Sequence, residues 1–543
     1  MARSYFLIYL LILLLISKAT ISQNYRQVDP PKVVIGIIVE NMRPDYVDRY
    51  WDKFGADGFR KLYSKGAVIS NMKITQHVQN YASGTATLFT GVPPSVHGIV
   101  DNAWYDRLRS KVTNCITDDY YFTVGADSKS GNVSPRKLMA NTVGDNLKVF
   151  SMNKSKVFSI AMNPESAIFA AGHSADAAWW FDTESGRMVS GSFYVSTFPE
   201  WARDYNMVSQ GEKYSGRNWV TLFPETQYSE SLPDNYYLEK GYGEKSNTFP
   251  HSMNRLVKAA GSFQPIKTSP FANTIIKEFT KALLDNEPVG QDDIPDLVTV
   301  FFSSMDYAHG SFGPASLEMQ DTYLRLDQEI AELITYAENK YGSDKILIYL
   351  TANTSASYPA EYLKQEFNMH AGEFQPESAL ALLNSLLNIT YGEEKWIENI
   401  TGHQIYLDHK LIKEKNIDLI EMRNLVADFI TQFEAVKVAL PSHILDQGGS
   451  DNGSLTGLYK TYMINRSGDI LYVLNEGWIP TYKYDRVNYT DQIHIPVVFY
   501  GARVKQTLIN EPYEATDIAP TLSEILHIPV PDKSRGKIIT GIQ

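Results

Sequence analysis

Buried strands are the first elements that the pattern of hydrophobic positions predicts. Residues 32–40 (KVVIGIIVE) form a continuous β-branched run, typical of a parallel strand covered on both faces. Similar runs predict strands at 67–73, 156–162, 297–303, 345–351 and 496–500. Helical periodicity is found at 45–65, 83–90 and 317–341. Strands that alternate with helices predict an α/β fold: a doubly wound, mainly parallel sheet with helices on both faces.

Two stretches interrupt this alternation, at 172–262 and 359–482. The first is rich in Tyr, Trp, Gly and Ser, and the second has helices and short strands of its own. We expect both to be cap insertions above the carboxyl edge of the sheet, where α/β proteins place their chemistry. The core is then built from 23–171, 263–358 and 483–543, and residues 1–22 precede it as a signal peptide.

The beginning of the chain has the pattern of a secretory signal. Arg3 precedes an apolar run from Phe6 to Ile16, and small and polar residues follow as far as Ser22. The run of about 11 apolar residues is shorter than the roughly 20 that span a membrane. No later stretch is long and apolar enough, so we expect no membrane span in the mature chain. Cys115 is the only cysteine, and an exported protein without disulfides fits a bacterial periplasm better than an animal extracellular space.

Charge excludes one large class of function. The chain has 50 Lys and Arg residues against 62 Asp and Glu residues, a formal net charge of -12. Binding to nucleic-acid backbones needs clustered positive charge, so we expect no nucleic-acid partner. The composition, with 43% hydrophobic residues, is that of a globular protein with a sizeable core.

Several segments resemble the alkaline phosphatase superfamily, which includes type I phosphodiesterases and nucleotide pyrophosphatases. They are VVIGIIVENMRPDYVDRYWDKFGADGFRKL, TGVPPSVHGIVDNAWYDR, SSMDYAHGSFGPASLEMQDTYLRLDQEI, LIYLTAN and TDIAPTLSEILHIPVP. KWIENITGHQIYLDHKLIKEKNIDL and INRSGDILYVLNEGWI in the second insertion are most similar to phosphate-irrepressible bacterial alkaline phosphatases. The resemblance covers nearly the whole mature chain.

The resemblance implies a particular active site. Active members hold two zinc ions with an Asp after the first strand, an Asp-x-x-x-His pair, an adjacent Asp-His pair and a late His. One zinc lowers the pKa of a Thr nucleophile and the other stabilises the leaving oxygen. A Lys and an Arg clamp the phosphoryl group, and an Asn contacts it. Zinc prefers imidazole and carboxylate ligands to neutral amides or hydroxyls.

The phosphate-binding positions of this chain depart from that pattern. Glu40 stands where the first-strand Asp is expected, and Tyr81 replaces the nucleophilic Thr. Asn102 matches the Asn that contacts phosphate. Asn163 and Glu165 occupy the positions of the cationic clamp, so positive charge is replaced by a neutral and a negative group.

The remaining metal positions are also altered. Asp306 keeps the Asp of Asp-x-x-x-His, but Gly310 replaces its His. Asn353 and Thr354 replace the adjacent Asp-His pair, and the late His corresponds to Asp485. Asp306 and Asn353 follow predicted strands, so we expect them to meet at one edge of the sheet with Glu40, Tyr81 and Asn102.

Losses at so many positions predict a retained fold with a degenerate active site. We expect the zinc pair of the family to be absent, and the protein to be a non-catalytic homologue that binds an unknown ligand or protein partner through the old cleft. The alternative is a divergent phosphomonoesterase or phosphodiesterase with a rebuilt single-metal site. A third hypothesis is a scaffold in which only the cap surface matters. Whether the chain is an enzyme stays open at this point.

Individual side chains leave further alternatives. Tyr81 is a possible nucleophile, and a register shift would give that role to Ser83 or Thr85, although helix capping is commoner for such residues. His309 and His494 are possible substitutes for the lost imidazoles. We expect three further histidines to be structural: His77, His97 and His173. Three charged residues of the long helix are expected on a solvated or salt-bridged face: Asp321, Arg325 and Asp327.

Overall fold

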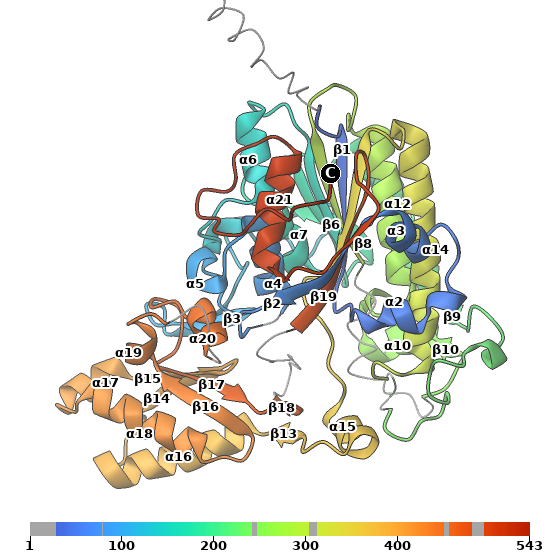
Figure 1. The fold of residues 1–543 in the computed structure, drawn as a ribbon. Helices are drawn as coiled ribbons and strands as arrows, with labels where there is room; N and C mark the ends of the chain where they lie inside the picture. The colour runs from blue at the N-terminus through green and yellow to red at the C-terminus, as the bar shows by residue number, and fades with distance from the viewer. Residues whose placement is uncertain are drawn as a thin grey trace, which may run out of the picture.

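A large central sheet organises the molecule, as the computed structural model shows for residues 29–78, 80–239, 241, 247–302, 312–449, 455–480 and 493–543. In these residues an 11-stranded sheet has the order β20-β2-β19-β12-β1-β11-β6-β7-β8-β5, with β21 beside β2 (Figure 1). The strands are β1 (Val33–Val39), β2 (Ala67–Ile74), β5 (Thr123–Val124), β6 (Val157–Ala161), β7 (Ala177–Asp182), β8 (Arg187–Gly191), β11 (Asp296–Phe302), β12 (Ile346–Thr351), β19 (Ile493–Gly501), β20 (Thr507–Ile509) and β21 (Tyr513–Glu514).

The centre of the sheet is parallel. The strands β12, β1, β11, β6 and β7 are joined by parallel pairs, whereas β19 runs antiparallel to β12 and β2, and β8 runs antiparallel to β7. Every residue of β1, β6, β11 and β12 is buried, in agreement with their mainly apolar sequences. The six strands predicted from the sequence all form, and the predicted fold class is confirmed.

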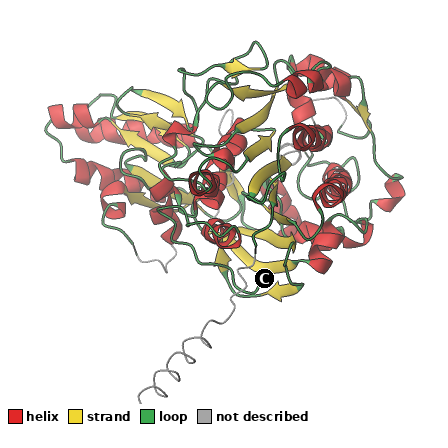
Figure 2. Cartoon of the chain, turned by 90° about the horizontal axis from the view of Figure 1, so that it is seen from above, coloured by secondary structure: helices red, strands yellow, loops and turns green. Residues whose placement is uncertain are grey.

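Helices cover both faces of this sheet. Figure 1 shows α4, α6, α7 and α21 on one side and α3, α12 and α14 on the other, and the view from above in Figure 2 shows strands between helices. The helices of the core are α2 (Asp45–Arg49), α3 (Phe59–Lys65), α4 (Tyr81–Thr90), α5 (Pro94–His97), α6 (Val143–Phe150), α7 (Pro164–Ala171), α11 (Gln264–Lys267), α12 (Phe271–Asn286), α14 (Leu317–Tyr341) and α21 (Ile518–Ile525). The long helix α14 has the bounds that its periodicity predicts.

The first insertion begins as part of the central sheet. Its strands β7 and β8 extend the sheet beyond β6, an arrangement that the sequence pattern did not predict. Its other elements are α8 (Glu200–Tyr205), α9 (Gln210–Ser215), β9 (Asn218–Trp219), β10 (His251–Ser252) and α10 (Met253–Ala260). Trp179 and Trp180 of β7 are fully buried, so this end of the sheet belongs to the main core.

The same insertion corrects the interpretation of α14. Asp321 was expected on a solvated or salt-bridged face, and it does pair with Arg325 at 2.7 Å, but its side chain is fully buried. It accepts hydrogen bonds from the indole of Trp219 (2.6 Å) and the hydroxyl of Tyr228 (2.5 Å). Asp327 is buried as well and accepts from the backbone N–H groups of Gly55 and Phe59, so this face of the helix is an anchor for other segments.

The second insertion has a hydrophobic core of its own. A four-stranded sheet, β14-β15-β17-β16, packs against helices at the lower left of Figure 1. Its elements are α15 (Ala360–Phe367), β13 (Gly372–Phe374), α16 (Pro376–Tyr391), β14 (Ile397–Thr401), β15 (Gln404–Leu407), α17 (His409–Glu414), α18 (Leu419–Thr431), β16 (Val436–Pro441), α19 (Ser442–Leu445), α20 (Thr456–Thr461), β17 (Ile470–Leu474) and β18 (Trp478–Pro480). Asp469 joins this unit to the core through Arg107, which reaches it from the hairpin β3 (Ala103–Asp106) and β4 (Lys111–Asn114).

Within the described part of the chain, no helix combines the length and the apolar character needed to cross a membrane. The predicted signal segment lies outside the described residues.

Candidate functional site

Strand register brings distant residues to one edge of the sheet. Val39 of β1 lies beside Phe302 of β11, and Ile38 lies beside Thr351 of β12. Glu40 and Asn353 therefore emerge at the same carboxyl edge, one and two residues beyond their paired strands. Asn163 reaches this edge from β6, because it is the residue that caps the start of α7.

Glu40 is fully buried and is held by neutral donors. Asn163 Nδ2 donates to Oε2 at 3.0 Å, and the hydroxyl of Ser166 donates to Oε1. Both donors lie at the start of α7, where the helix dipole favours a negative charge. The Glu40 carboxylate is thus bound by an amide and a hydroxyl next to a helix terminus. Sequence reasoning missed Ser166, because its role depends on a contact with Glu40, which lies 126 residues before it in the chain.

Tyr81 begins the helix that follows β2. Asn80 caps α4 by accepting from the N–H of Ser83 at 2.9 Å, which places Tyr81 in the first turn. The Tyr81 hydroxyl accepts from Asn41 Nδ2 at 2.5 Å, and Asn41, with φ of 59°, has the left-handed conformation that Asn tolerates. The phenol therefore lies beside the segment that carries Glu40.

Asn353 packs directly against α4. Its Nδ2 donates to the hydroxyl of Thr85 at 3.0 Å, while its buried Oδ1 has no hydrogen-bond partner among the described residues. A Cβ added at Gly84 would lie 1.9 Å from the backbone oxygen of Asn353, so only glycine allows this approach. Thr354 is also buried. Asn353 and Thr354 thus contribute an amide and a hydroxyl in close packing at the positions where the family resemblance implies an Asp-His pair.

Ser83 and Thr85, the alternative nucleophiles, are both buried and engaged. The Ser83 hydroxyl donates to the backbone oxygen of Val78 at 3.0 Å, and Thr85 accepts from Asn353. Asn102 joins the same region through Asp101, which accepts from the Asn102 N–H and from Asn80 Nδ2 at 2.7 and 2.8 Å. These bonds position Asn102 at the start of α4.

The described site also contains Glu165 and Lys267, a basic residue that the sequence analysis did not predict. Glu165 lies in the first turn of α7 and is partly buried. Burial lowers the pKa of Lys267, at the end of α11, while the charges of Glu165 and Glu40 act in the opposite direction. Lys267 is therefore a basic side chain within electrostatic reach of both carboxylates. It lies outside every motif of the family resemblance, so the sequence carried no signal for it.

His77, His97 and His173, which were expected to be structural, each form hydrogen bonds within the fold. His97 is buried, accepts from the N–H of Ile99 through Nδ1 and contacts the Thr87 hydroxyl through Nε2, and burial lowers its pKa to about 3. His77 pairs with His403 at 3.2 Å. Against the effect of burial, the hydrogen bond to Asp145 raises the pKa of His173. The side chain of His494 is exposed on β19 beside Lys73.

Four candidate residues lie outside the described residues: Asp306, His309, Gly310 and Asp485. Among the residues that are described, no group of three or more His, Cys, Asp and Glu side chains is arranged to hold a metal ion. The described donors do not fit a zinc pair, since one carboxylate is bound by neutral donors and the Asp-His pair is an amide and a hydroxyl.

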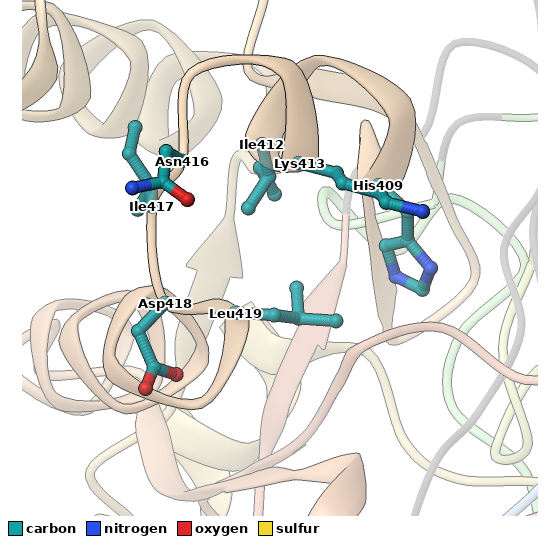
Figure 3. Close-up of a pocket in the computed structure, with 7 residues that line it drawn as sticks. All are labelled: His409, Ile412, Lys413, Asn416, Ile417, Asp418 and Leu419. Carbon is teal, nitrogen blue, oxygen red and sulfur yellow. The ribbon is translucent and has the colours of Figure 1, made fainter.

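A pocket occurs in the second insertion. It has a volume of about 560 Å³ and is formed by α17 and the turn that leads to α18 (Figure 3). His409, which lines it, is bound to Asp469 at 2.7 Å. The pocket does not include any of the residues carried over from the family.

Comparison with known proteins identifies the family. The sequence model of the family "Type I phosphodiesterase / nucleotide pyrophosphatase" matches residues 34–494. The chain belongs to this family. It is 32% identical to alkaline phosphatase PafA of Elizabethkingia meningoseptica, over 98% of each chain. It is also 32% identical to alkaline phosphatase PhoV of Synechococcus elongatus, over 94% of this chain and 93% of that protein.

The fold comparison agrees with the sequence comparison. A crystal structure of wild-type alkaline phosphatase PafA has a TM-score of 0.89 to this structure, with 95% of this chain and 99% of that chain covered. Membership of the alkaline phosphatase superfamily is therefore confirmed, and the fold of a phosphatase-superfamily hydrolase is retained across nearly the whole chain.

Proposed function

We propose that this protein is an exported, non-catalytic member of the family that binds a ligand or a protein partner through the carboxyl edge of the sheet. The observation that carries the proposal is the state of Glu40, whose two carboxylate oxygens are occupied by Asn163 and Ser166. A carboxylate whose two oxygens accept from an amide and a hydroxyl is less available as a metal ligand than a free one. Export is supported by the signal pattern around Phe6–Ile16.

The replaced groups remove each contribution to phosphoryl transfer. The Tyr81 hydroxyl accepts from the amide of Asn41, and an amide cannot serve as the general base that would activate a phenol as a nucleophile. Asn163 and Glu165 offer no positive charge to a transferring phosphoryl group, and a carboxylate at the clamp repels one. The neutral amides and hydroxyls that remain are suited to binding rather than to charge stabilisation.

A divergent hydrolase is the second candidate, and one observation favours it. Asn41 donates to the Tyr81 hydroxyl at 2.5 Å, beside the segment with Glu40, so the phenol is positioned and stabilised as an acceptor. In that case Tyr81 would be the catalytic residue, and a Tyr81→Phe variant would lose all turnover. The two candidates are separated by the following measurement.

We expect protein purified without added metal to contain well under one zinc ion per chain. Its hydrolysis of p-nitrophenyl phosphate should be lower than that of PafA, purified in the same way, by a factor of about 10⁴ or more, because groups that act as a unit lose function together. Metal analysis and steady-state kinetics check both points. Stoichiometric zinc, with hydrolysis that a chelator abolishes, would favour the divergent hydrolase instead.

A further inference from the structure

The segment that carries Asp101 and Asn102 connects the candidate site to the second insertion. We call residues 98–107 the Asn102 segment. Asp101 accepts from Asn80 Nδ2 at 2.8 Å, and Asn80 caps the start of α4. The Asn102 backbone oxygen accepts from the N–H of Cys115 at 2.8 Å, next to the hairpin of β3 and β4. A shift of this segment therefore moves groups at the candidate site.

Arg466 of the second insertion holds the first half of the Asn102 segment. It lies between α20 and β17, and its Nη1 donates to the backbone oxygen of Gly98 and, at 2.7 Å, to that of Lys137. A Cβ at residue 98 would lie 2.6 Å from this Nη1, so a larger residue there would displace the guanidinium. The Arg466 guanidinium carbon also lies 5.0 Å from the centre of the buried Trp104 ring, within the range of a cation–π interaction.

Asp469, three residues further along, holds the other end of the segment. Its side chain is buried, and its Oδ2 accepts from Arg107 Nη2 of the β3–β4 hairpin. Arg107 Nη1 also donates to Glu398 Oε2 at 3.2 Å and to the Leu407 backbone oxygen at 2.9 Å. Within the insertion, Asp469 Oδ1 accepts from Arg423 Nη2 at 2.6 Å, so the carboxylate is fixed to that unit.

Charge and ring packing make this second anchor rigid. Against the effect of burial, the hydrogen bond to His409 and the charges of Arg107 and Arg423 hold the pKa of Asp469 below its ordinary value. Hydrogen bonds between ionised groups are about twice as strong as those between neutral ones. The rings of Tyr105 on β3 and Tyr406 on β15 lie 5.6 Å apart, where the hairpin meets the insertion (Figure 1).

We propose that Arg466 and Asp469 are positioning residues, through which the second insertion sets the placement of Asp101 and Asn102 at the carboxyl edge. A binding site is precise when the side chains that touch the ligand are held by surrounding packed and hydrogen-bonded groups. Here those groups belong to a unit with its own hydrophobic core, and they lie 368 and 362 residues from their partners Gly98 and Arg107.

The anchors couple the insertion to the site. A partner that shifts the second insertion also shifts Asn102, because the Asn102 segment is fastened to the insertion near both of its ends. The inference rests on the proposed function in one respect, since it takes the carboxyl edge of the sheet as the place where a ligand binds.

Three matched substitutions test the proposal in the full chain. Arg466→Met and Arg107→Met each remove one anchor of the Asn102 segment. Lys460→Met is the control, because it breaks a bond between the same insertion and another part of the core: Lys460 donates to Glu514 of β21 at 2.7 Å. Each variant loses one cation and keeps an unbranched side chain.

Cys115, the only cysteine, reports opening of the Asn102 segment. It is fully buried, and burial raises the pKa of its thiol, so a thiol reagent reacts with it after local opening. We expect labelling by the thiol reagent DTNB to be about 10- to 100-fold faster in the two arginine variants, the factor that corresponds to losing one or two charged hydrogen bonds, and unchanged in the control. Hydrogen exchange of peptides from 98–107 should lose protection in the same two variants, while peptides from α18 keep theirs.

Unchanged labelling and exchange in both arginine variants would overturn the proposal. Equal acceleration in Lys460→Met would also overturn it, because general loosening of the insertion would then open the segment. If an arginine variant does not fold, Arg466→Lys decides, since it keeps the charge and loses the planar group over Trp104: intermediate labelling supports the proposal, and labelling at the natural rate contradicts it. Neither measurement involves zinc or ester hydrolysis, so failure here is distinct from failure of the proposed function.

Discussion

Replacement of Asp321 with alanine should lower the free energy of unfolding by about 3–5 kcal/mol, the range for removing one partner of a buried ion pair. The Asp321 carboxylate accepts from four donors: Trp219 Nε1, the Leu222 N–H, the Tyr228 hydroxyl and Arg325 Nε, at 2.5–2.7 Å. Alanine would leave all four without their acceptor, in a site where the Asp321 side chain is fully buried.

Urea denaturation followed by circular dichroism measures this loss. Asp321→Asn should fall between alanine and the natural residue, because the amide keeps one acceptor oxygen but turns a donor toward the others. Glu361→Ala is the control: Glu361 pairs with Lys364 on an exposed helix face, and its loss should cost less than about 0.5 kcal/mol. A loss below about 1 kcal/mol for Asp321→Ala would mean that the first insertion is not held to α14 by this carboxylate.

The strands of the core were predictable because their chemistry is local. Residues 33–39, 297–302 and 346–350 are almost entirely apolar, which is typical of a strand buried on both faces. The bounds of α14 were predictable for a similar reason: Ser316 caps the helix, and Gly342 follows its last residue, Tyr341. Each signal lies within the element that it specifies.

Features that depend on contact between distant segments were not predictable. Asp321 has the spacing of an i, i+4 partner of Arg325, which is typical of a solvated pair, and nothing near it in the sequence shows that Trp219 and Tyr228 cover it. The strand β7 pairs parallel with β6 across α7, but its residues fall in the stretch that was assigned to the first insertion. The strand β8 was missed because it forms an antiparallel pair with β7 at the end of the sheet, without an intervening helix. An antiparallel pair lacks the alternation that predicts a parallel strand.

In the candidate site too, local features were predictable and contacts between distant segments were not. Glu40, Tyr81 and Asn353 were placed at one edge by the general rule for α/β sheets, and the structure brings their segments into hydrogen-bond contact through Asn41 and Thr85. Ser166 and Lys267 were missed, because each becomes part of the site only when α7 and α11 pack against the strand ends. The replacements at the family positions were visible in the sequence, but the way they are accommodated was not.

Restoring the family residues one or two at a time should give almost no phosphatase activity until most of them are present. Tyr81→Thr supplies an alcohol but no metal ion to lower its pKa. Asn353→Asp with Thr354→His rebuilds one metal position, yet leaves Glu165 to repel phosphate. Asn163→Lys alone removes the amide that donates to Glu40 at 3.0 Å, so it disturbs the existing network before it helps any substrate. We therefore expect each of these variants to remain at background turnover.

The combined variants should recover function in two stages. The first set rebuilds the ligands and the nucleophile: Glu40→Asp, Tyr81→Thr, Gly310→His, Asn353→Asp, Thr354→His and Asp485→His. It should bind zinc first. Addition of Asn163→Lys and Glu165→Arg should then raise hydrolysis of p-nitrophenyl phosphate by about 10²–10³-fold, the effect of placing charge-stabilising donors at a transition state. Zinc content and kinetics at each step distinguish the two stages.

The clamp substitutions without the ligand set are the matched control, and they should neither bind zinc nor hydrolyse the substrate. The order matters because groups that act as a unit contribute non-additively, so the last groups restored account for most of the gain. Two results would contradict this account. One is turnover from the clamp substitutions alone. The other is a real activity of the natural protein that Tyr81→Phe abolishes, since the phenol held by Asn41 would then be the nucleophile and the site would be rebuilt rather than degenerate.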